Sequence, residues 1–222
     1  MENREKWNAA QIAERNAHAG TYEHGVVVYE DSYRQYFERL NGSFSIPGKT
    51  IMEIGCADFP ALGYCTDFKH GHIIEPMPSW MLNKQIEGKP ITLHATPAED
   101  MPVIPVDEVW IFNVYQHVID PYKLFEYAKQ CGNIVRFFEP IDLPLDECHL
   151  HSLSLEDFRR VFGDCAKLYK SSPGVKNFHT ADCAYGVWEK KWGAWEDFTT
   201  ENGVICKKRK AENADSIEIV SK

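Results

Sequence analysis

The sequence lacks a long apolar segment. None of its hydrophobic runs approaches the roughly 18 consecutive apolar residues that a membrane-spanning helix requires. The first residues, Met1–Lys6, are charged and do not follow the pattern of a secretory signal, in which an apolar stretch follows a basic start. We therefore expect a cytoplasmic protein that does not associate with a membrane.

Paired cysteines are also missing. The chain has 7 cysteines, an odd number, and no two of them have the Cys-x-x-Cys spacing of many metal and redox sites. A disulfide-stabilised fold is thereby disfavoured, and reduced thiols of a cytosolic protein are expected. Internal repeats are absent as well. A chain of 222 residues with 44% hydrophobic content suffices for a single hydrophobic core.

Basic residues are in deficit. Lys and Arg number 24 against 33 Asp and Glu, which gives a formal net charge of -9. A nucleic acid is bound largely through phosphate contacts to Lys and Arg, so an acidic protein would need a concentrated basic patch. Lys207–Lys210 is such a run, but it lies in a polar segment, residues 201–222, that we expect to be a disordered tail. A small molecule is therefore favoured over nucleic acid as the partner.

The most informative segment that is present is Lys49–Asp58. An apolar strand there ends near Glu53, and a glycine follows where the chain must turn. A second apolar run ends in Glu75, so two carboxylates are expected at corresponding strand ends, where a carboxylate suits the two hydroxyls of a ribose. The dinucleotide fingerprint is incomplete, because Ala57 and Phe59 stand where further glycines would leave room for a pyrophosphate. The segment thus favours a ligand without phosphates.

The alternation of apolar strands and helical segments predicts the fold class. Beyond the first strand, we expect strands at 71–75, 91–95, 107–114 and 133–140, and helices at 1–19, 29–40, 78–87, 120–131 and 154–163. Such alternation is typical of a doubly wound α/β domain with a mostly parallel sheet. After residue 163, Cys165–Lys170 and Ala184–Trp188 predict a C-terminal antiparallel hairpin. We divide the chain into a helical lid (1–44), a ligand-binding domain (45–200) and the tail.

Four motifs resemble, in order and spacing, those of class I S-adenosylmethionine-dependent methyltransferases. They are Glu53–Ala57, Ile74–Met77, Ala95–Pro102 and Asp107–Val118. The resemblance implies a Rossmann-like methyltransferase fold over residues 45–190, with S-adenosyl-L-methionine as cofactor and S-adenosyl-L-homocysteine as product. It places the motifs, in order, at the methionine part, the ribose, the adenine and the sulfonium. The implied cofactor contacts are Glu53, Gly55, Cys56, Ala57, Glu75, Pro76, Met77, Pro97, Ala98, Glu99, Asn113 and Val114, with Tyr22 from the lid.

The chain departs from the family pattern at Phe59 and Pro97. Phe59 is expected either to narrow the methionine pocket or to be accommodated because Pro60 and Ala61 begin the next helix. Pro97 has no side-chain hydrogen bond to offer adenine, which leaves that contact to backbone atoms or to Glu99. Two other hypotheses stay open. One is a cofactor-binding partner or sensor without transfer activity. The other is a nicotinamide-dependent dehydrogenase, which the glycine spacing disfavours.

Methyl transfer is expected to be a direct in-line displacement, because a sulfonium is already activated and the protein needs mainly to align the reactants. A general base helps where the acceptor is a hydroxyl or a protonated amine, and histidine is the usual base near neutral pH. His117 follows the fourth strand, and His149 and His151 follow the fifth. The competing interpretation for His117 is that it caps or braces the loop before the helix that starts at Asp120 and Pro121. No metal is expected at Asp146–His151, because three ligands in so short a run would be cramped.

Two aromatic groups have roles that the sequence leaves open. Tyr22 and His24 lie in the glycine-bounded segment Ala19–Gly25, which is either a lid that completes the acceptor pocket or an ordinary loop. Three tryptophans near the C-terminus are interpreted as packing residues, with an acceptor wall or a homodimer contact as the alternative. They are Trp188, Trp192 and Trp195.

Overall fold

The computed structural model describes residues 2–18, 22–171, 181–194, 196–200, 205–213 and 215–221. Its centre is a seven-stranded sheet with the order β3-β2-β1-β4-β5-β7-β6. The strands are β1 (Thr50–Ile54), β2 (His70–Ile74), β3 (Ile91–His94), β4 (Val106–Phe112), β5 (Gly132–Pro140), β6 (Lys167–Tyr169) and β7 (Cys183–Glu189). Strands β1 to β5 are parallel, and β7 runs antiparallel to β5 and β6. The predicted doubly wound sheet with its antiparallel hairpin is confirmed.

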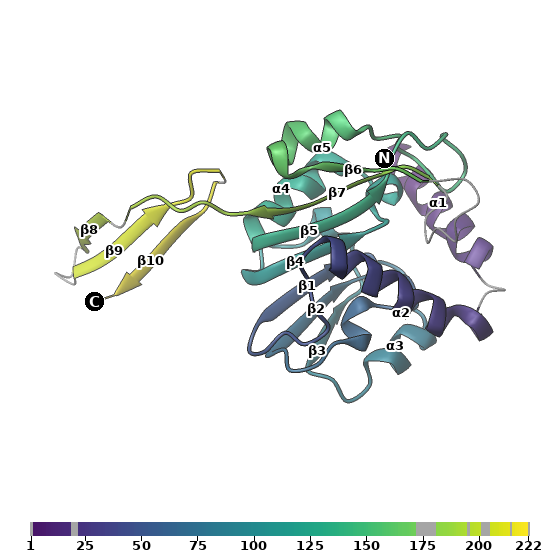
Figure 1. Ribbon diagram of the computed structural model, residues 1–222, viewed down its shortest axis with the longest axis horizontal. Helices are drawn as coiled ribbons and strands as arrows, with labels where there is room; N and C mark the ends of the chain where they lie inside the picture. The colour runs from purple at the N-terminus through teal and green to yellow at the C-terminus, as the bar shows by residue number, and fades with distance from the viewer. Residues whose placement is uncertain are drawn as a thin grey trace.

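Helices cover both faces of this sheet (Figure 1). One face carries α2 (Tyr22–Arg39) and α3 (Trp80–Ile86), and the other carries α4 (Pro121–Cys131) and α5 (Leu155–Phe162). The N-terminal helix α1 (Glu2–His18) contacts the turn that follows β4. Among the described residues, no helix is both long and apolar enough to cross a membrane.

Each face of the sheet has its own apolar core. On the α2 face, Tyr33, Tyr36, Phe37 and Leu40 are buried at helical spacing, so one stripe of α2 packs on the strands. On the opposite face, α4 and α5 bury Leu124, Phe125, Phe158 and Phe162 against Phe137 of β5. The two cores fix the sheet between its helices and leave the carboxyl ends of the parallel strands for a ligand.

Two crossovers between parallel strands contain no α-helix. The β1–β2 crossover has only the 3-10 turn η1 (Ala61–Tyr64), where Pro60 and Ala61 were expected to begin a helix, and the β3–β4 crossover has only η2 (Ala98–Asp100). The chain from Ala61 to His70 must return along a five-residue strand, about 17 Å. Ten residues of α-helix would cover only about 15 Å and leave nothing for the turns. A more extended path is therefore required.

The C-terminal residues form a second, antiparallel sheet that projects from the first (Figure 1). Its strands are β8 (Glu196–Thr199), β9 (Ile205–Lys210) and β10 (Ile217–Ser221), in the order β10-β9-β8. The expectation of a disordered tail over residues 201–222 is therefore wrong for β9 and β10. The basic run is partnered across the hairpin, where Arg209 Nε donates to Glu218 Oε2 at 2.6 Å. A charge run in the sequence does not show such cross-strand partners.

The tryptophans of this region pack against the protein. Trp188 is 5% exposed and belongs to the core under α4. The Arg209 guanidinium lies over the Trp192 ring, 4.8 Å from its centroid. Trp195 lies outside the described residues. Trp188 is therefore a packing residue, and neither it nor Trp192 lines the cavity described next, which disfavours the acceptor-wall alternative for these two.

Candidate functional site

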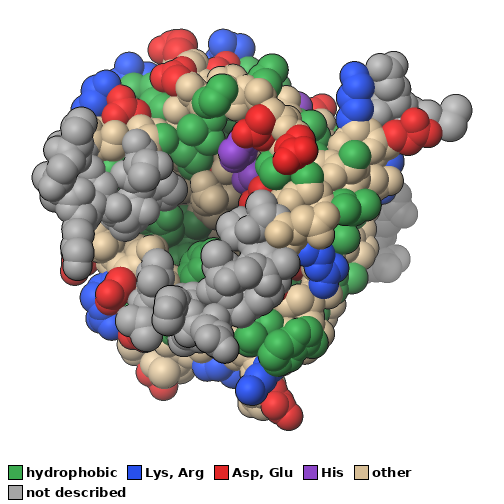
Figure 2. All heavy atoms as spheres, turned by 90° about the vertical axis from the view of Figure 1, so that its right-hand side faces the viewer, with side chains coloured by type: hydrophobic (Ala, Val, Ile, Leu, Met, Phe, Trp, Pro, Cys, Tyr) green, Lys and Arg blue, Asp and Glu red, His purple; other side chains and the backbone are tan. Residues whose placement is uncertain are grey.

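A cavity of about 380 Å³ opens at the carboxyl ends of the parallel strands, where it appears as a hollow in Figure 2. Folds with such sheets bind ligands at this edge. Its walls come from the turns after β1, β2, β3 and β4 and from helices α1 and α2. The implied cofactor contacts that line it are Gly55, Cys56, Ala57, Glu75, Pro76, Met77, Pro97, Ala98, Glu99, Asn113 and Val114.

The turn after β1 brings the backbone close to the cavity. Gly55 has a φ of 64°, and a Cβ atom there would lie 2.8 Å from both methyl groups of Val114. Only glycine therefore fits without displacing Val114. Ala57 also has a left-handed backbone, with a φ of 49°, which costs energy for a residue with a side chain. This backbone directs the N–H groups of Cys56 and Ala57 toward the end of β2.

Glu75 receives those N–H groups. Its Oε2 accepts from Cys56 N at 3.2 Å and Ala57 N at 3.0 Å, and its Oε1 accepts from Met77 N at 3.1 Å. Burial raises the pKa of Glu75, and the three backbone N–H groups oppose that rise. A carboxylate has about four lone-pair positions, so Glu75 can accept further hydrogen bonds on its cavity side.

Glu53, in contrast, does not line the cavity. Its carboxylate lies beneath the first turn, where Oε1 accepts from Ala61 N at 2.7 Å and Oε2 from Leu62 N at 2.9 Å. The side chain is 1% exposed, and burial raises its pKa to about 7. Glu53 thus holds the 3-10 turn η1 in place, and the implied direct contact with a cofactor is not seen.

Phe59 does not narrow the cavity. Its side chain is 3% exposed and stacks on Tyr29 of α2, with ring centroids 4.9 Å apart. Its carbonyl oxygen accepts from the Tyr33 hydroxyl at 2.6 Å. The alternative of a narrowed methionine pocket is therefore not supported, because the ring is buried against Tyr29 of α2 beside the turn and does not line the cavity.

The third motif lines the cavity and also anchors a neighbouring loop. Glu99 Oε1 accepts from Ile119 N at 2.8 Å and from Asp120 N at 3.1 Å. Those residues precede α4, which begins at Pro121 with Asp120 as its N-cap. Pro97 and Ala98 remain on the cavity wall.

Glu139, at the end of β5, is a residue that sequence reasoning missed. Its Oε2 accepts from Val114 N at 2.7 Å and Tyr115 N at 3.0 Å, and it thereby fixes the chain after Asn113, whose φ is 63°. Glu139 is fully buried, and burial raises its pKa to about 8. Its Oε1 has no partner among the described residues. The available signal was an acid ending an apolar run, the pattern that singled out Glu53 and Glu75.

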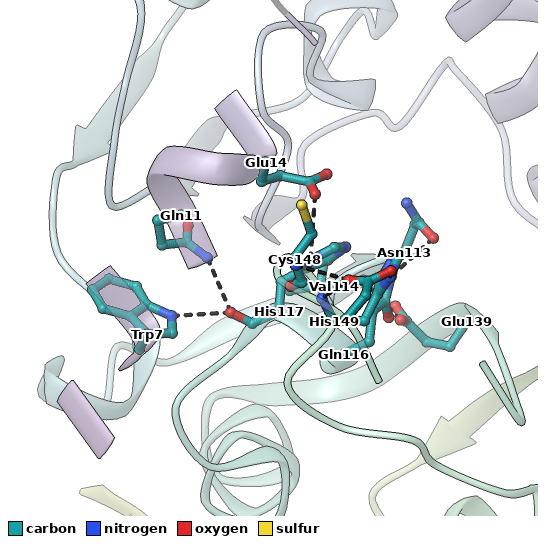
Figure 3. A network of polar contacts seen from close by, with 11 residues as sticks. Trp7, Gln11, Glu14, Asn113, Val114, Gln116, His117, Glu139, Cys148 and His149 are labelled. Atoms are coloured by element: carbon teal, nitrogen blue, oxygen red, sulfur yellow. Dashed lines mark hydrogen bonds and ion pairs between the residues drawn. The ribbon is translucent and has the colours of Figure 1, made fainter. Parts of the chain in front are cut away.

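The three predicted histidines occupy different places. His117 lines the cavity; its Nδ1 lies 3.0 Å from Cys148 O and 3.7 Å from Glu14 Oε2 (Figure 3). The His149 ring is 4.9 Å from that of His117, and its Nδ1 lies 2.8 Å from Asp146 Oδ2. His151 lies apart from the cavity, its Nε2 bonded to a backbone carbonyl at 2.9 Å. Within the described residues, no three His, Cys, Asp or Glu side chains are placed to hold a metal.

The N-terminal helices contribute more of the cavity than sequence reasoning proposed. Their lining residues are Trp7, Gln11, Glu14, Arg15, Tyr29, Ser32, Tyr33 and Tyr36. Helix α1 docks where Trp7 Nε1 and Gln11 Nε2 both donate to His117 O, at 2.9 and 3.0 Å (Figure 3). Tyr22 and His24 fall within α2, and their side chains lie outside the described residues.

Comparison with known proteins is informative at the level of structure. Neither a family model nor a curated protein sequence matches the chain. The N-methyltransferase NodS from Bradyrhizobium japonicum WM9, in complex with S-adenosyl-L-homocysteine, superposes with a TM-score of 0.58 at 12% identity, covering 83% of this chain and 97% of NodS. The chain has the class I methyltransferase fold.

Two further structures show the range of this methyltransferase fold. The DhpI–SAH complex superposes with a TM-score of 0.52 at 14% identity over 81% of this chain and 95% of DhpI. The [4+2]-cyclase SpnF superposes with a TM-score of 0.50 at 9% identity over 64% of this chain and 58% of SpnF. Since a cyclase shares the fold, the reaction has to be argued from the site.

Proposed function

We propose that this protein transfers a methyl group from S-adenosyl-L-methionine to a small-molecule acceptor by direct in-line displacement. The observation that carries the proposal is Glu75, a buried carboxylate on the cavity wall at the end of β2, tied to a turn that only Gly55 allows. NodS and DhpI, which share the fold, hold S-adenosyl-L-homocysteine in their structures, which supports this choice of cofactor.

The residues present fit such a cofactor. The cavity volume, about 380 Å³, falls within the usual range for small-molecule sites. The described lining contains more carboxylates than cationic side chains, because Arg15 is its single Lys or Arg. This excess of negative charge suits a ligand that carries a sulfonium cation. These carboxylates are Glu14, Asp58, Glu75 and Glu99.

In this proposal Glu75 accepts hydrogen bonds from the ribose hydroxyls, and the turn from Gly55 to Ala57 contacts the methionine part. Pro97 and Ala98 enclose the adenine, with backbone atoms as its polar partners. The residues after β4, which Glu139 fixes, lie beneath the sulfonium. The cofactor, when bound, supplies a methyl group on an activated sulfur, and the protein holds the acceptor in line with it.

His117 is our candidate for the general base. A carbonyl oxygen only accepts, so the contact with Cys148 O places the proton of the neutral imidazole on Nδ1. Nε2 is then the nitrogen that can take a proton from the acceptor. His149 is a second candidate, farther toward the surface. For His151 the structure supports only the bracing of Val118, a cavity residue whose carbonyl it contacts.

Calorimetric titration with S-adenosyl-L-homocysteine and, separately, with NADH tests the proposal. We expect binding of the former and none of the latter, with a rise in Tm, because a ligand specific for the folded state stabilises it by mass action. No heat and no Tm change at millimolar S-adenosyl-L-homocysteine would overturn it. Formation of S-adenosyl-L-homocysteine with a panel of small acceptors then separates an enzyme from a protein that only binds.

A further inference from the structure

The cavity opens outward through a second hollow, of about 650 Å³, beside His117. Glu14, Asn113 and His117 line both spaces, so the two hollows adjoin, and we treat the second as the mouth of the first. Its other lining residues are Asp146, Glu147, Cys148 and His149. Figure 3 shows Glu14 of α1 above His117, with Cys148 and His149 beside it. Acidic and histidine side chains meet at the rim of the hollow in Figure 2.

The described lining of this mouth contains three carboxylates and no Lys or Arg. The pKa of the Cys148 thiol reflects the negative charge of these carboxylates. Burial and the carboxylates of Glu14, Asp146 and Glu147 together raise this pKa to about 11. Asp146 remains ionised, because N–H groups of Cys148 and His149 donate to it and hold its pKa near 2. The mouth that leads to the candidate base therefore has a negative electrostatic potential.

A buried oxygen without a partner lies behind this mouth. Glu139 Oε1 has no hydrogen-bond partner among the described residues, although Glu139 is fully buried. Its carboxyl bonds to Val114 N and is close enough to Tyr36 to raise the pKa of that hydroxyl. Val114 and Tyr36 both line the cavity. Glu139 itself lines neither space, and its raised pKa of about 8 leaves it mostly protonated at neutral pH, so the negative charge of the mouth comes from Glu14, Asp146 and Glu147.

We propose that the acceptor is a small amine that enters through this mouth as a cation. The inference rests on the proposed function and names its substrate class. Carboxylates attract a protonated amine and disfavour an anionic acceptor. The ammonium loses one proton to His117 Nε2, which becomes an imidazolium. The nitrogen lone pair then forms the N–C bond to the methyl carbon while the C–S bond breaks and its electron pair stays on sulfur. The positive charge moves from sulfur to the methylated nitrogen.

Analogues of the cofactor with nitrogen in place of sulfur test the charge preference without knowledge of the acceptor. The nitrogen carries a three-carbon arm that replaces the methyl and ends in an ammonium, a methyl or a carboxylate. We expect the ammonium arm to bind on the order of 10-fold more tightly than the carboxylate arm, because the mouth repels an anion. Replacing Glu14 and Glu147 together by Gln should reduce that ratio to about 3-fold or less. Glu87→Gln, on the exposed end of α3, is the matched control and should leave the ratio unchanged.

The outcomes separate the inference from the proposed function. Equal affinities of the three arms, or preference for the carboxylate, would overturn the amine assignment while S-adenosyl-L-homocysteine still binds. Failure of S-adenosyl-L-homocysteine itself to bind would overturn the proposed function. Because Glu14 also contacts His117, the single variant Glu147→Gln is measured too, and it should lower the ratio without changing affinity for S-adenosyl-L-homocysteine. If the ratio of ammonium-arm to carboxylate-arm affinity is the same in Glu147→Gln as in the wild type, the amine assignment is also contradicted.

Discussion

The two sides of the cavity are held by different kinds of bond. On the strand side, buried carboxylates each accept two or more backbone N–H groups of a neighbouring loop; they are Glu53, Glu75, Glu99 and Glu139. On the helix side, the polar contacts that attach α1 are two side chains that share one carbonyl, His117 O, the contact of Glu14 with His117, and the exposed ion pair of Arg4 with Asp100.

This difference indicates how rigid each side is. A backbone N–H bond to a buried carboxyl group is charge-assisted and strong where the group is ionised, and in either form breaking it leaves an unpaired buried group. An exposed ion pair contributes about 0–1 kcal/mol. A helix in a protein is stabilised mainly by packing of its apolar face, and of the described side chains of α1 only Trp7 and Ala10 are buried. The strand side is where the methyl donor is proposed to bind, and we call it the donor side; the α1 side is the acceptor side. We infer that the donor side is formed before a ligand arrives, whereas the acceptor side adjusts to the acceptor. The predictions below test this contrast, from the largest expected effect to the smallest.

The largest effect is expected at the junction of the two sides, His117. His117→Ala should lower the rate of methyl transfer by about 100-fold, the range for loss of a general base, while affinity for S-adenosyl-L-homocysteine stays nearly unchanged. Added imidazole should restore part of the rate, which a purely structural role would not allow. His151→Ala is the control, because His151 lies outside the cavity. Full transfer by His117→Ala at saturating donor would remove the base assignment.

The next effect concerns the donor side alone. Glu75→Ala should weaken binding of S-adenosyl-L-homocysteine by about 1–3 kcal/mol, because the ribose hydroxyls and two N–H groups of the first turn lose their acceptor. Glu75→Gln keeps one acceptor oxygen and should lose less affinity for S-adenosyl-L-homocysteine than Glu75→Ala. Calorimetry on folded variants measures both, with the exposed Glu126→Ala as control. An unchanged Kd for Glu75→Ala would show that Glu75 is not the ribose ligand.

The buried carboxylate of Glu139 should make the donor side sensitive to pH. Its pKa is about 8 in the folded protein, above the ordinary value of 4.5, so the folded state holds this proton more tightly than the unfolded state. The stabilisation is complete below about pH 4.5 and is lost as pH rises through 8, with a slope of at most about 1.4 kcal/mol per pH unit. Glu139→Gln should remove this slope. Urea unfolding from pH 5 to 9 measures this slope as the free energy of unfolding against pH. The same pH dependence in the wild type and in Glu139→Gln would contradict the assignment.

The contrast between the two sides also explains what the sequence could predict. The donor side could be predicted because Glu53, Gly55 and Glu75 lie at or directly after the ends of apolar strands, and chain direction alone brings such strand ends together. Glu53 still proved to be a support beneath the turn. The sequence pattern shows that an acid ends a strand, but the side to which its carboxylate turns depends on which N–H groups lie nearby.

The acceptor side was not readable in the same way. Glu14 and His117 meet only because α1 docks on the turn after β4, and the pattern of α1 does not say where it docks. His149 and His151 both follow the fifth strand of the sequence and would share one side of an extended run, yet only His149 reaches the mouth. Hydrogen bonds from Leu150 N and His151 N to Gln116 O turn that segment locally. Such tertiary contacts override a local alternation of side chains.

The smallest effect is expected where α1 is attached. Gln11→Ala removes one of the two donors to His117 O and should cost about 1 kcal/mol locally, a usual value for one hydrogen bond. Because Trp7 still donates to the same oxygen, no carbonyl is left unpaired, and global unfolding should change little. Hydrogen exchange should quicken in α1 but not in the loops held by Glu75 and Glu139. Affinity for S-adenosyl-L-homocysteine should stay the same, while acceptor KM rises. If exchange quickens equally in those loops, the two sides are not held independently, and the donor side is not formed in advance.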